Sequence, residues 1–256
     1  MNLITMPPLT QTLGPWIKPL PGKYSTQLSK EKELLNELID KLPKFHFFRQ
    51  RFHYSQKNWL PFYWNGFKQT TRYTYVLEDI SNPDKIWDNM QGNIRREIKK
   101  ASDVVHLEVT DDPNVMWDLW NLNFEHKGQE VQTNYEDFIR IDNACAEHNA
   151  RKIFLAKDKH GNLHSAMYLI WDEQSAYYLI GGANPEYRTS GAASFLMYEA
   201  IKFASDKTKR FDFEGSMIES VERFFRGFGG VQTPYFEITK SNFLTQSLIS
   251  AKELVG

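Results

Sequence analysis

The chain has 256 residues, of which 41% are hydrophobic and 25% are charged, as in an ordinary globular protein. This length is enough for one large domain or for two smaller lobes that share a core. The formal net charge of −1 excludes a strong overall field that would attract nucleic acid, so a nucleic-acid partner would need a local basic patch.

Cysteine content and hydropathy indicate the compartment. The single cysteine, Cys145, excludes an intrachain disulfide and is typical of a reducing compartment. No apolar run approaches the ~20 residues that span a bilayer. Residues 1–8 carry neither the basic region nor the long apolar stretch of a signal peptide. We therefore expect a cytoplasmic protein with no membrane span.

The first part of the chain predicts an extended arm, a helix and several short aromatic segments. Residues 1–28 are rich in Pro, Gly and Thr and predict the arm. Apolar residues recur at helical spacing over residues 30–42, and Pro43 ends that helix. Residues 45–67 hold short aromatic runs. The run at 59–67 is more typical of a core than of an acceptor pocket, and both interpretations stay open.

The next part predicts helices separated by strands. Residues 71–78 are rich in β-branched and aromatic residues and predict a strand. Residues 81–84 provide a cap, a proline and an acidic first turn, and the apolar face of the helix that they begin continues to Ile98. The pattern then predicts a strand at 104–109, a helix after Asp112, and a helix at 135–148 that Asn134 caps.

Strands predominate from residue 151 onward. The segments at 151–156, 163–171 and 175–181 predict a meander, with a turn at 159–162. The remaining expected elements are a helix at 190–204, a strand at 210–213, a helix at 218–225, a strand at 235–239 and an amphipathic helix at 241–254. The order from residue 104 is therefore β-α-α-β-β-β-α-β-α-β.

One glycine-bearing segment, with the residues Arg188-Thr189-Ser190-Gly191-Ala192-Ala193, follows an apolar strand and begins a helix. N–H groups at a helix N-terminus lack intrahelical partners, and the helix dipole adds positive potential there, so this junction can bind a phosphate or a pyrophosphate. Arg188 can contact phosphate, and Gly191 lets the backbone approach it closely. A plain helix start that needs a small residue explains the pattern as well.

A second segment is RFFRGFGG at 223–230, shortly after FDFEG at 211–215. Asp212 and Glu214 alternate with phenylalanines along the expected strand, so the two carboxylates share one face. Glu214 can accept a proton as a general base. The alternative is a solvated face or an ion pair with an arginine of the second segment, and this is the interpretation that we prefer for Asp212.

Basic residues gather on two expected helices. Arg223 and Arg226 lie three residues apart on one helical face and can bind a phosphate or a carboxylate. The segment RREIKKA at 95–101 carries Arg95, Arg96, Lys99 and Lys100. These four cations suit a phosphate-rich partner, but a solvated helix face is the interpretation that we prefer.

These motifs resemble those of a known superfamily. R-x-x-G-x-A between a strand and a helix resembles the pyrophosphate loop of GNAT acyltransferases. FDFEG followed by RFFRGFGG, with the strand at 77–80 and RREIKKA upstream, resembles more closely the Fem peptidyltransferases, GNAT-fold enzymes that add amino acids from aminoacyl-tRNA to cell-wall precursors. The resemblance covers roughly residues 73–240. It implies an α/β (α+β) fold with a mixed sheet flanked by helices, in which an arm and partial GNAT-like lobe (1–104) precede a GNAT core (105–256).

The resemblance also implies an N-acyltransferase that moves an acyl group from acyl-CoA to a primary amine of a small molecule or peptide. The pyrophosphate would be held by Arg188, Gly191, Ala192 and Ala193. Glu214 would be the base, and Arg223 and Arg226 would contact an anionic part of the substrate. Phe225 stands where many GNAT enzymes have a tyrosine as general acid and where Fem proteins have a lysine. The acid must then be another group, such as Tyr187 or Tyr198.

Two other functions fit the same residues. Fem-like transfer from aminoacyl-tRNA to a cell-wall or peptide acceptor is not favoured, because the sequence lacks the sustained heptad pattern of a long helical arm. A catalytically silent GNAT-fold binding protein is the other, and Phe225 is the residue that favours it. The nearest histidine pair, His46 and His53, has no ligand spacing, so we expect no metal site.

Overall fold

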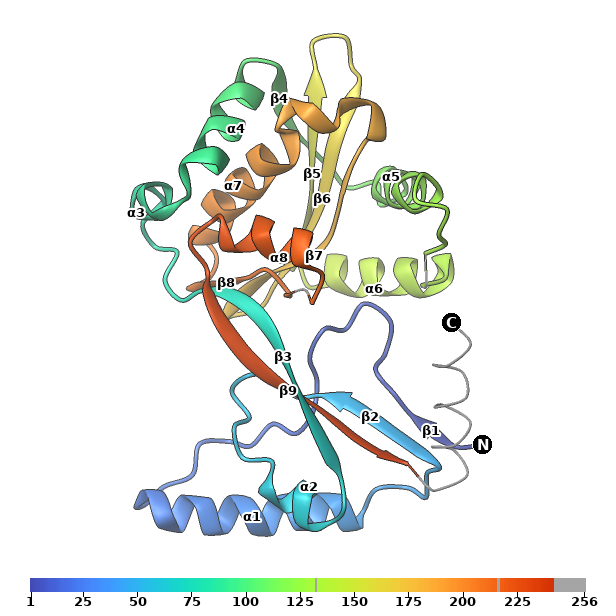
Figure 1. Ribbon diagram of the computed structural model, residues 1–256, viewed down its shortest axis with the longest axis vertical. Helices are drawn as coiled ribbons and strands as arrows, with labels where there is room; N and C mark the ends of the chain where they lie inside the picture. The colour runs from blue at the N-terminus through green and yellow to red at the C-terminus, as the bar shows by residue number, and fades with distance from the viewer. Residues whose placement is uncertain (132, 216, 242–256) are drawn as a thin grey trace. The chain divides into compact units, whose positions relative to one another are not determined.

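The computed structural model describes residues 1–131, 133–215 and 217–241, which form two compact units (Figure 1). The first unit comprises Met1–Tyr73 and the described residues from Pro234 onward, and the second unit comprises Thr74–Thr233. The helix predicted at 241–254 lies outside the described residues, apart from Ser241, which ends a strand.

The first unit has its own small core. Strand β1 (Leu3–Ile4) runs parallel to β2 (Phe47–Arg51), and β2 pairs antiparallel with the end of β9 (Val231–Ser241). Helices α1 (Tyr24–Asp40) and α2 (Leu60–Trp64) contribute the rest of the core. The buried residues that pack together are Leu35, Phe48, Phe52, Phe62, Phe67 and Ile238.

Local structure in the first unit differs from the sequence-based expectation at two places. The expected arm at 1–28 contains β1 and the first turn of α1, which begins at Tyr24 rather than at residue 30. In the aromatic run, Phe62 and Phe67 are buried and meet edge to face at 5.2 Å between ring centroids. Trp64 on the same short helix is 57% exposed. The core interpretation therefore holds for one face of this run only.

The second unit contains the elements from α3 to α8 and one end each of β3 (Lys68–Leu77) and β9. Its helices are α3 (Pro83–Asn89), α4 (Gly92–Ser102), α5 (Asn114–Glu125), α6 (Tyr135–Glu147), α7 (Ala192–Ser205) and α8 (Glu219–Arg226), with the 3-10 helix η1 (Pro185–Ser190). Its strands are β4 (Val105–Thr110), β5 (Arg151–Asp158), β6 (Leu163–Trp171), β7 (Ser175–Ala183) and β8 (Arg210–Asp212). The element order predicted from residue 104 is confirmed.

The described strands form one mixed nine-stranded sheet with the order β1-β2-β9-β3-β8-β7-β6-β5-β4. Strands β5 to β7 make the predicted antiparallel meander, β4 adds to it antiparallel beside β5, and β7 and β8 are parallel. In the second unit, α3, α4 and α7 lie on one side of the meander, and α5 and α6 lie on the other (Figure 1). The mixed α/β sheet flanked by helices that the sequence predicted is therefore present.

The helix predicted to run from residue 83 to Ile98 is two helices. Met90 has φ −67° and ψ 148°, which is extended backbone and ends α3. The N–H of Gln91 donates to the carbonyl of Gly227 at 2.9 Å, a tertiary contact that replaces a helical hydrogen bond. Met90 and Ile94 are both buried despite the break. The apolar spacing therefore predicted correctly which residues are buried, but it was wrong in predicting one continuous helix.

The boundary predicted near residue 104 lies inside the second unit, between α4 and β4. The division into a partial and a complete lobe stays a prediction. Among the helices that the structure describes, none is long and apolar enough to cross a membrane.

Candidate functional site

The second half of β7 presents an open backbone edge. β7 pairs with β8 through Ser175, Ala176 and Tyr177, and β8 ends opposite Tyr177. From Tyr178 to Ala183, β7 pairs with β6 on its other side. Within the described residues, no strand pairs with the β8 side of this second half. Side chains from both faces of the sheet can therefore meet around a free edge.

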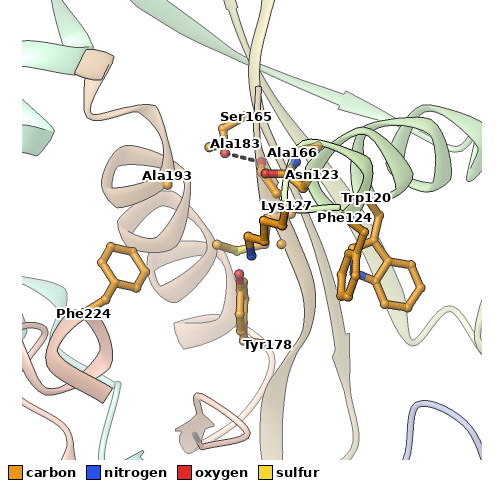
Figure 2. A pocket seen from close by; sticks show the side chains of 13 residues that line it. Trp120, Asn123, Phe124, Lys127, Ser165, Ala166, Tyr178, Ala183, Ala193 and Phe224 are labelled. Atoms are coloured by element: carbon orange, nitrogen blue, oxygen red, sulfur yellow. Dashed lines mark hydrogen bonds between the residues drawn. The ribbon is translucent and has the colours of Figure 1, made fainter. Parts of the chain in front are cut away.

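A pocket of about 170 Å³ lies at this edge (Figure 2). Its walls come from the end of α5, from β6 and β7, from the first turn of α7 and from α8. The wall residues that matter for chemistry or shape are Asn123, Lys127, Ser165, Tyr178, Ala193 and Phe224. All of them belong to the second unit.

Tyr178 places its hydroxyl inside the pocket. Its ring rises from β7 with the oxygen toward the centre of the pocket (Figure 2). A Cβ atom at Gly181 would overlap the Tyr178 hydroxyl, so this hydroxyl can hold its present position only beside a glycine. The ring packs edge to face against Phe225, with 5.6 Å between centroids. Burial raises the pKa of Tyr178 to about 12, so the phenol keeps its proton at neutral pH and can donate a hydrogen bond.

Other polar groups of the pocket shape its walls or its mouth. Ser165 Oγ donates to the carbonyl of Gly182 at 2.8 Å, and Asn123 Nδ2 donates to the carbonyl of Leu119 at 2.7 Å. Both bonds hold neighbouring backbone in place. Lys127 is exposed, its Nζ lies 5.7 Å from the centroid of a neighbouring phenylalanine ring, and its side chain reaches into the pocket (Figure 2). It is therefore a cation that an entering ligand meets.

The start of α7 is held against α4. Gly191 has the left-handed backbone angles φ 80° and ψ 6°, and a Cβ atom there would lie 2.5 Å from the carbonyl oxygen of Glu97. Ser194 Oγ donates to Glu97 Oε2 at 2.6 Å, and Lys100 Nζ donates to the carbonyl of Thr189 at 2.6 Å. Packing on α4 therefore requires glycine at 191, and the predicted donor contact of Gly191 stays a prediction.

The other residues predicted around this loop have different surroundings. Arg188 is exposed, Ala192 is buried, and Ala193 lines the pocket. The ring of Tyr187 stacks on the imidazole of His164, with 4.2 Å between centroids and 5° between planes. Of the residues predicted to bind the donor, Ala193 is thus the one that the structure brings to the pocket.

The two carboxylates of the FDFEG segment do not share a strand face. β8 ends at Asp212, and Glu214 has a φ of 56°. Asp212 Oδ1 accepts hydrogen bonds from Thr74 Oγ1 at 2.5 Å and from the N–H of Glu214 at 2.8 Å. Asp212 is 4% exposed, so the solvated-face interpretation that we preferred for it is wrong.

Burial also decides the protonation of these two groups. Desolvation raises the pKa of Asp212 to about 6, against the opposing effect of its two hydrogen bonds. Desolvation and then the charge of Asp212 raise the pKa of Glu214 well above its usual range. Glu214 lies at this turn rather than in the wall of the pocket. Its role as a base stays a prediction.

Helix α8 carries the RFFR residues in two different environments. Arg223 lies 3.6 Å from Glu219, and Arg226 Nε lies 2.9 Å from Glu222 Oε1, both on the exposed side of the helix. Phe225 is 3% exposed and stacks on Phe213 at 5.4 Å between centroids. Phe225 is thus a core residue that supports Tyr178. Substrate contacts of the two arginines stay a prediction.

The basic helix α4 is partly engaged within the molecule. Lys100 holds the loop before α7, and Lys99 Nζ lies 5.9 Å from the centroid of the Trp87 ring. Arg95 is half-buried and Arg96 is exposed. Two of the four cations therefore have structural contacts, which weakens the case for a phosphate-binding patch.

A second hollow, of about 390 Å³, lies on the surface of the second unit. Its lining residues are Leu122, His126, Asn184, Pro185 and Glu186. They come from the end of α5, from the residue that follows it, and from the segment between β7 and η1 with the start of η1. Across the described residues, no group of three or more His, Cys, Asp or Glu side chains is placed to hold a metal ion.

The fold and the pocket can now be compared with known proteins. Residues 88–226, more than half of the chain, match the model of the Acetyltransferase (GNAT) domain family. The chain belongs to this family. Membership supports acyl transfer as the general activity of this GNAT protein. No curated protein matches the chain in sequence.

Solved structures with the same fold include relatives of the Fem type. The crystal structure of FemX matches with a TM-score of 0.63 at 15% identity, covering 80% of this chain and 76% of FemX. L-PGS from Bacillus licheniformis matches with a TM-score of 0.56 at 12% identity, covering 92% of this chain and 80% of the other. The C-terminal domain of a putative lysylphosphatidylglycerol synthetase from Agrobacterium fabrum gives 0.59 at 11% identity, with coverages of 81% and 72%. These likenesses show that the GNAT protein has a Fem-like fold.

Sequence reasoning missed Tyr178 and Lys127 as pocket residues. Tyr178 lies within an apolar strand, where an aromatic residue is typical of a core. The pair Gly181-Gly182 near the end of the strand could have indicated a pocket here, since glycine inside a strand often marks the close approach of another group. Lys127 follows a helix and has no local pattern that distinguishes it from a solvated lysine.

Proposed function

We propose that this protein is an N-acyltransferase that moves an acyl group from acyl-CoA to a primary amine. The observation that carries the proposal is the pocket at the open edge of β7, which brings together the Tyr178 hydroxyl and the first turn of α7. The family match supports acyl transfer in general, and the choice of donor and acceptor comes from the chemistry of this pocket.

The donor would lie along β7. The long arm of CoA carries amides, which can hydrogen-bond to an unpaired strand edge much as an added peptide strand does. Gly181 and Gly182 leave that edge without side chains. The first turn of α7, at Ala193, offers N–H groups and a favourable dipole to the pyrophosphate, and the exposed Arg188 adds a cation nearby.

The transfer itself needs few groups. The amine nitrogen attacks the thioester carbonyl carbon, a C–N bond forms, and the C–S bond breaks. Tyr178 can donate a proton to the leaving sulfur and regain one from the nitrogen, because its raised pKa keeps the hydroxyl protonated between turnovers. The small volume of the pocket, about 170 Å³, suits a short acyl group such as acetyl.

Thermal unfolding with acetyl-CoA and with longer acyl-CoAs tests this proposal. A donor at ~100 times its Kd should stabilise the protein by ~2.7 kcal/mol. We expect a shift with acetyl-CoA that is smaller for Arg188→Ala, a change that leaves the packing of Gly191 on α4 intact. If none of the acyl-CoAs shifts the unfolding temperature, acyl-CoA is excluded as the donor.

A second candidate is transfer of an aminoacyl group from aminoacyl-tRNA, which the fold likeness to FemX favours. It predicts a donor affinity that falls steeply with salt, since tRNA binding releases counterions. Tight tRNA binding together with no acyl-CoA shift would favour this second candidate.

A further inference from the structure

Strand β4 has an open outer edge. It is the last strand in the order of the sheet, and β5 is the strand that pairs with it among the described residues. The pairing is regular from Val105 to Thr110, without a bulge. An open edge presents unpaired N–H and C=O groups that accept another strand, and proteins usually block it with a very short strand, a bulge, a proline or a lysine. The opposite end of the sheet, β1, is very short, whereas β4 has none of these features.

One face of β4 is apolar and only partly covered. Val105, Leu107 and Val109 point to the same face, because side chains alternate along a strand. Val105 is buried in the core of the second unit, whereas Leu107 is 38% exposed and Val109 is 55% exposed. The apolar face therefore extends beyond the core at the open edge, where another strand would cover it.

The other face of β4 carries an imidazole and a carboxylate. His106 Nε2 lies 3.0 Å from Glu108 Oε1, and Lys157 Nζ on β5 donates to Glu108 Oε2 at 2.7 Å. The hydrogen bonds from Lys157 and then from His106 hold the pKa of Glu108 below its usual range. Glu108 is thus an ionised acceptor at neutral pH, and it is partly open to a neighbouring strand.

We propose that the open edge of β4 pairs antiparallel with β4 of a second copy of this chain, about a two-fold axis that passes through Leu107. The two sheets then form one continuous sheet. This inference concerns assembly, and it does not depend on the donor or the acceptor of the acyl transfer proposed above.

The register follows from the sequence of the strand. In a two-fold pair, a contact from residue i to residue j is matched by one from j to i. With Leu107 on the axis, Leu107 faces its own mate, Val105 faces Val109, and His106 faces Glu108. Each pair therefore joins two apolar side chains or an imidazole and a carboxylate, which are favourable cross-strand pairs.

The neighbouring registers are less favourable. An axis through Glu108 would place two carboxylates directly opposite each other, and like charges in this position repel. An axis through His106 would set the apolar Val109 opposite Asp103. An axis between two residues would place the apolar face of one copy beside the polar face of the other, because a shift by one residue exchanges the faces. The axis through Leu107 is the register that satisfies both faces.

The symmetry limits the assembly to two chains. Both copies use the same edge, so the pair closes and leaves no β4 edge for a third chain. Pairing through a single strand from each copy makes a small interface, and small interfaces are typical of reversible association. We therefore expect monomers and dimers in an equilibrium that depends on protein concentration.

Sedimentation of the full chain from low micromolar to near-millimolar concentration tests the proposal. The average mass should rise from one chain toward two and no further. Leu107→Lys should hold the protein at one chain mass, because it places two cations opposite each other, and Val109→Lys should weaken association by setting a cation opposite Val105. Leu122→Lys and Val231→Lys replace similarly exposed residues elsewhere in the second unit and should leave the dimer unchanged. The circular dichroism spectrum of each variant monitors folding.

Cysteine cross-linking tests the register. In a Cys145→Ala background, Leu107→Cys should form a covalent dimer on oxidation, because directly opposite residues are within reach of a disulfide. The two thiols of Val109→Cys would lie about 14 Å apart along the strands, at ~3.4 Å for each of four residues, and should not cross-link.

Each result bears on the proposal. A dimer that Leu107→Lys abolishes, together with cross-linking at 107 and none at 109, supports it. A single chain mass at every concentration would overturn it and leave the edge open for a different extended chain. Association that Leu107→Lys and Leu122→Lys affect equally, growth beyond two chains, or equal cross-linking at 107 and 109 would overturn it as well. Acyl transfer and acetyl-CoA binding are unaffected by any of these outcomes.

Discussion

At the scale of single residues, the contact between Tyr178 and Gly181 determines the shape of the pocket. Both residues belong to β7, and the hydroxyl of Tyr178 occupies the space that a side chain at 181 would take. Phe225 packs against the ring from α8. The phenol is therefore held rigidly at the open strand edge, as a proton donor must be to act in the transition state.

Replacing Tyr178 by phenylalanine tests this role. Removal of the hydroxyl should lower kcat by roughly 100-fold or more, because the leaving group loses its proton donor. The acetyl-CoA thermal shift should stay nearly unchanged, since the ring still packs on Phe225. Tyr177→Phe removes a hydroxyl that donates to the exposed Asp172 at 3.0 Å and serves as the control. Full activity of Tyr178→Phe would exclude the phenol from the reaction.

Asp212 gives a prediction for the pH dependence of stability. Its pKa rises to about 6 in the folded protein from about 3.9 in an unfolded chain. The folded state therefore binds the proton more tightly, and the associated stability is complete below pH ~4 and is lost as the pH rises through ~6. The full loss corresponds to about 3 kcal/mol, at 1.36 kcal/mol for each pH unit.

The variant Asp212→Asn should lack this loss. Asparagine keeps an oxygen that can accept from Thr74 and from the N–H of Glu214 but cannot ionise. Urea unfolding at pH 4.5 and 7.5 should show a smaller decrease for Asp212→Asn than for the original protein. Asp206→Asn, at an exposed aspartate after α7, is the comparison. Equal pH dependence in Asp212→Asn and the original protein would contradict the raised pKa.

At the scale of elements, helix α4 positions the start of α7. Three contacts from one turn of α4 reach the segment between Thr189 and Ser194. The sequence left a phosphate-binding patch on the basic stretch of α4 as one alternative. The structure shows that this stretch holds the loop beside the pocket in place. The same contacts explain why Gly191 is a poor residue for testing donor binding, since any side chain there strikes Glu97.

Lys100→Met tests this positioning role. Methionine keeps an apolar stem but loses the hydrogen bond to the carbonyl of Thr189. Such a bond contributes roughly 0.5–1.5 kcal/mol, so the Kd of acetyl-CoA should rise roughly two- to tenfold through a looser loop. Lys99→Met, which removes a cation near the Trp87 ring, should leave that Kd unchanged in a calorimetric titration. Equal Kd values for both variants and the original protein would show that the loop does not depend on this bond.

At the scale of the whole molecule, each compact unit has a separate hydrophobic core. The core of the second unit runs from Tyr75 to Phe228 and lies between the sheet and α3, α4, α7 and α8. The core of the first unit is smaller and largely aromatic. The pocket and the second hollow are both lined by residues of the second unit.

Phe62→Ala tests the separation of the cores. Phe62 is 2% exposed in the first core, and truncation of a buried phenylalanine costs about 3–5 kcal/mol. Hydrogen exchange should show faster opening of α1, α2 and β2, while acetyl-CoA still shifts the unfolding of the second unit. Tyr63→Ala, at a position 59% exposed on the same helix, should have little effect on either. Loss of the acetyl-CoA shift in Phe62→Ala would contradict this separation.

The element order and the mixed α/β class could be predicted from the sequence because they depend on local patterns. Short apolar segments and the turn at 159–162 identified β5, β6 and β7, and Asn134 was correctly predicted as the cap of α6, where its side chain accepts from the N–H of Asp137 at 2.8 Å. Local patterns failed where tertiary contacts override them. The N–H of Gln91 donates to the carbonyl of Gly227 where the helical pattern is broken. Asp212 is buried and accepts a hydrogen bond from Thr74 on the neighbouring strand β3.

The sequence by itself determined the family resemblance, the order of elements and the helix start at Gly191, since each depends on residues close together in the chain. Only the tertiary structure decided which groups meet. It placed Tyr178 and Ala193 around one pocket and packed Gly191 on Glu97. The physical reason is that the early end of β8 leaves β7 with a free edge, and the pairing of two strands separated by a helix cannot be read from either strand alone.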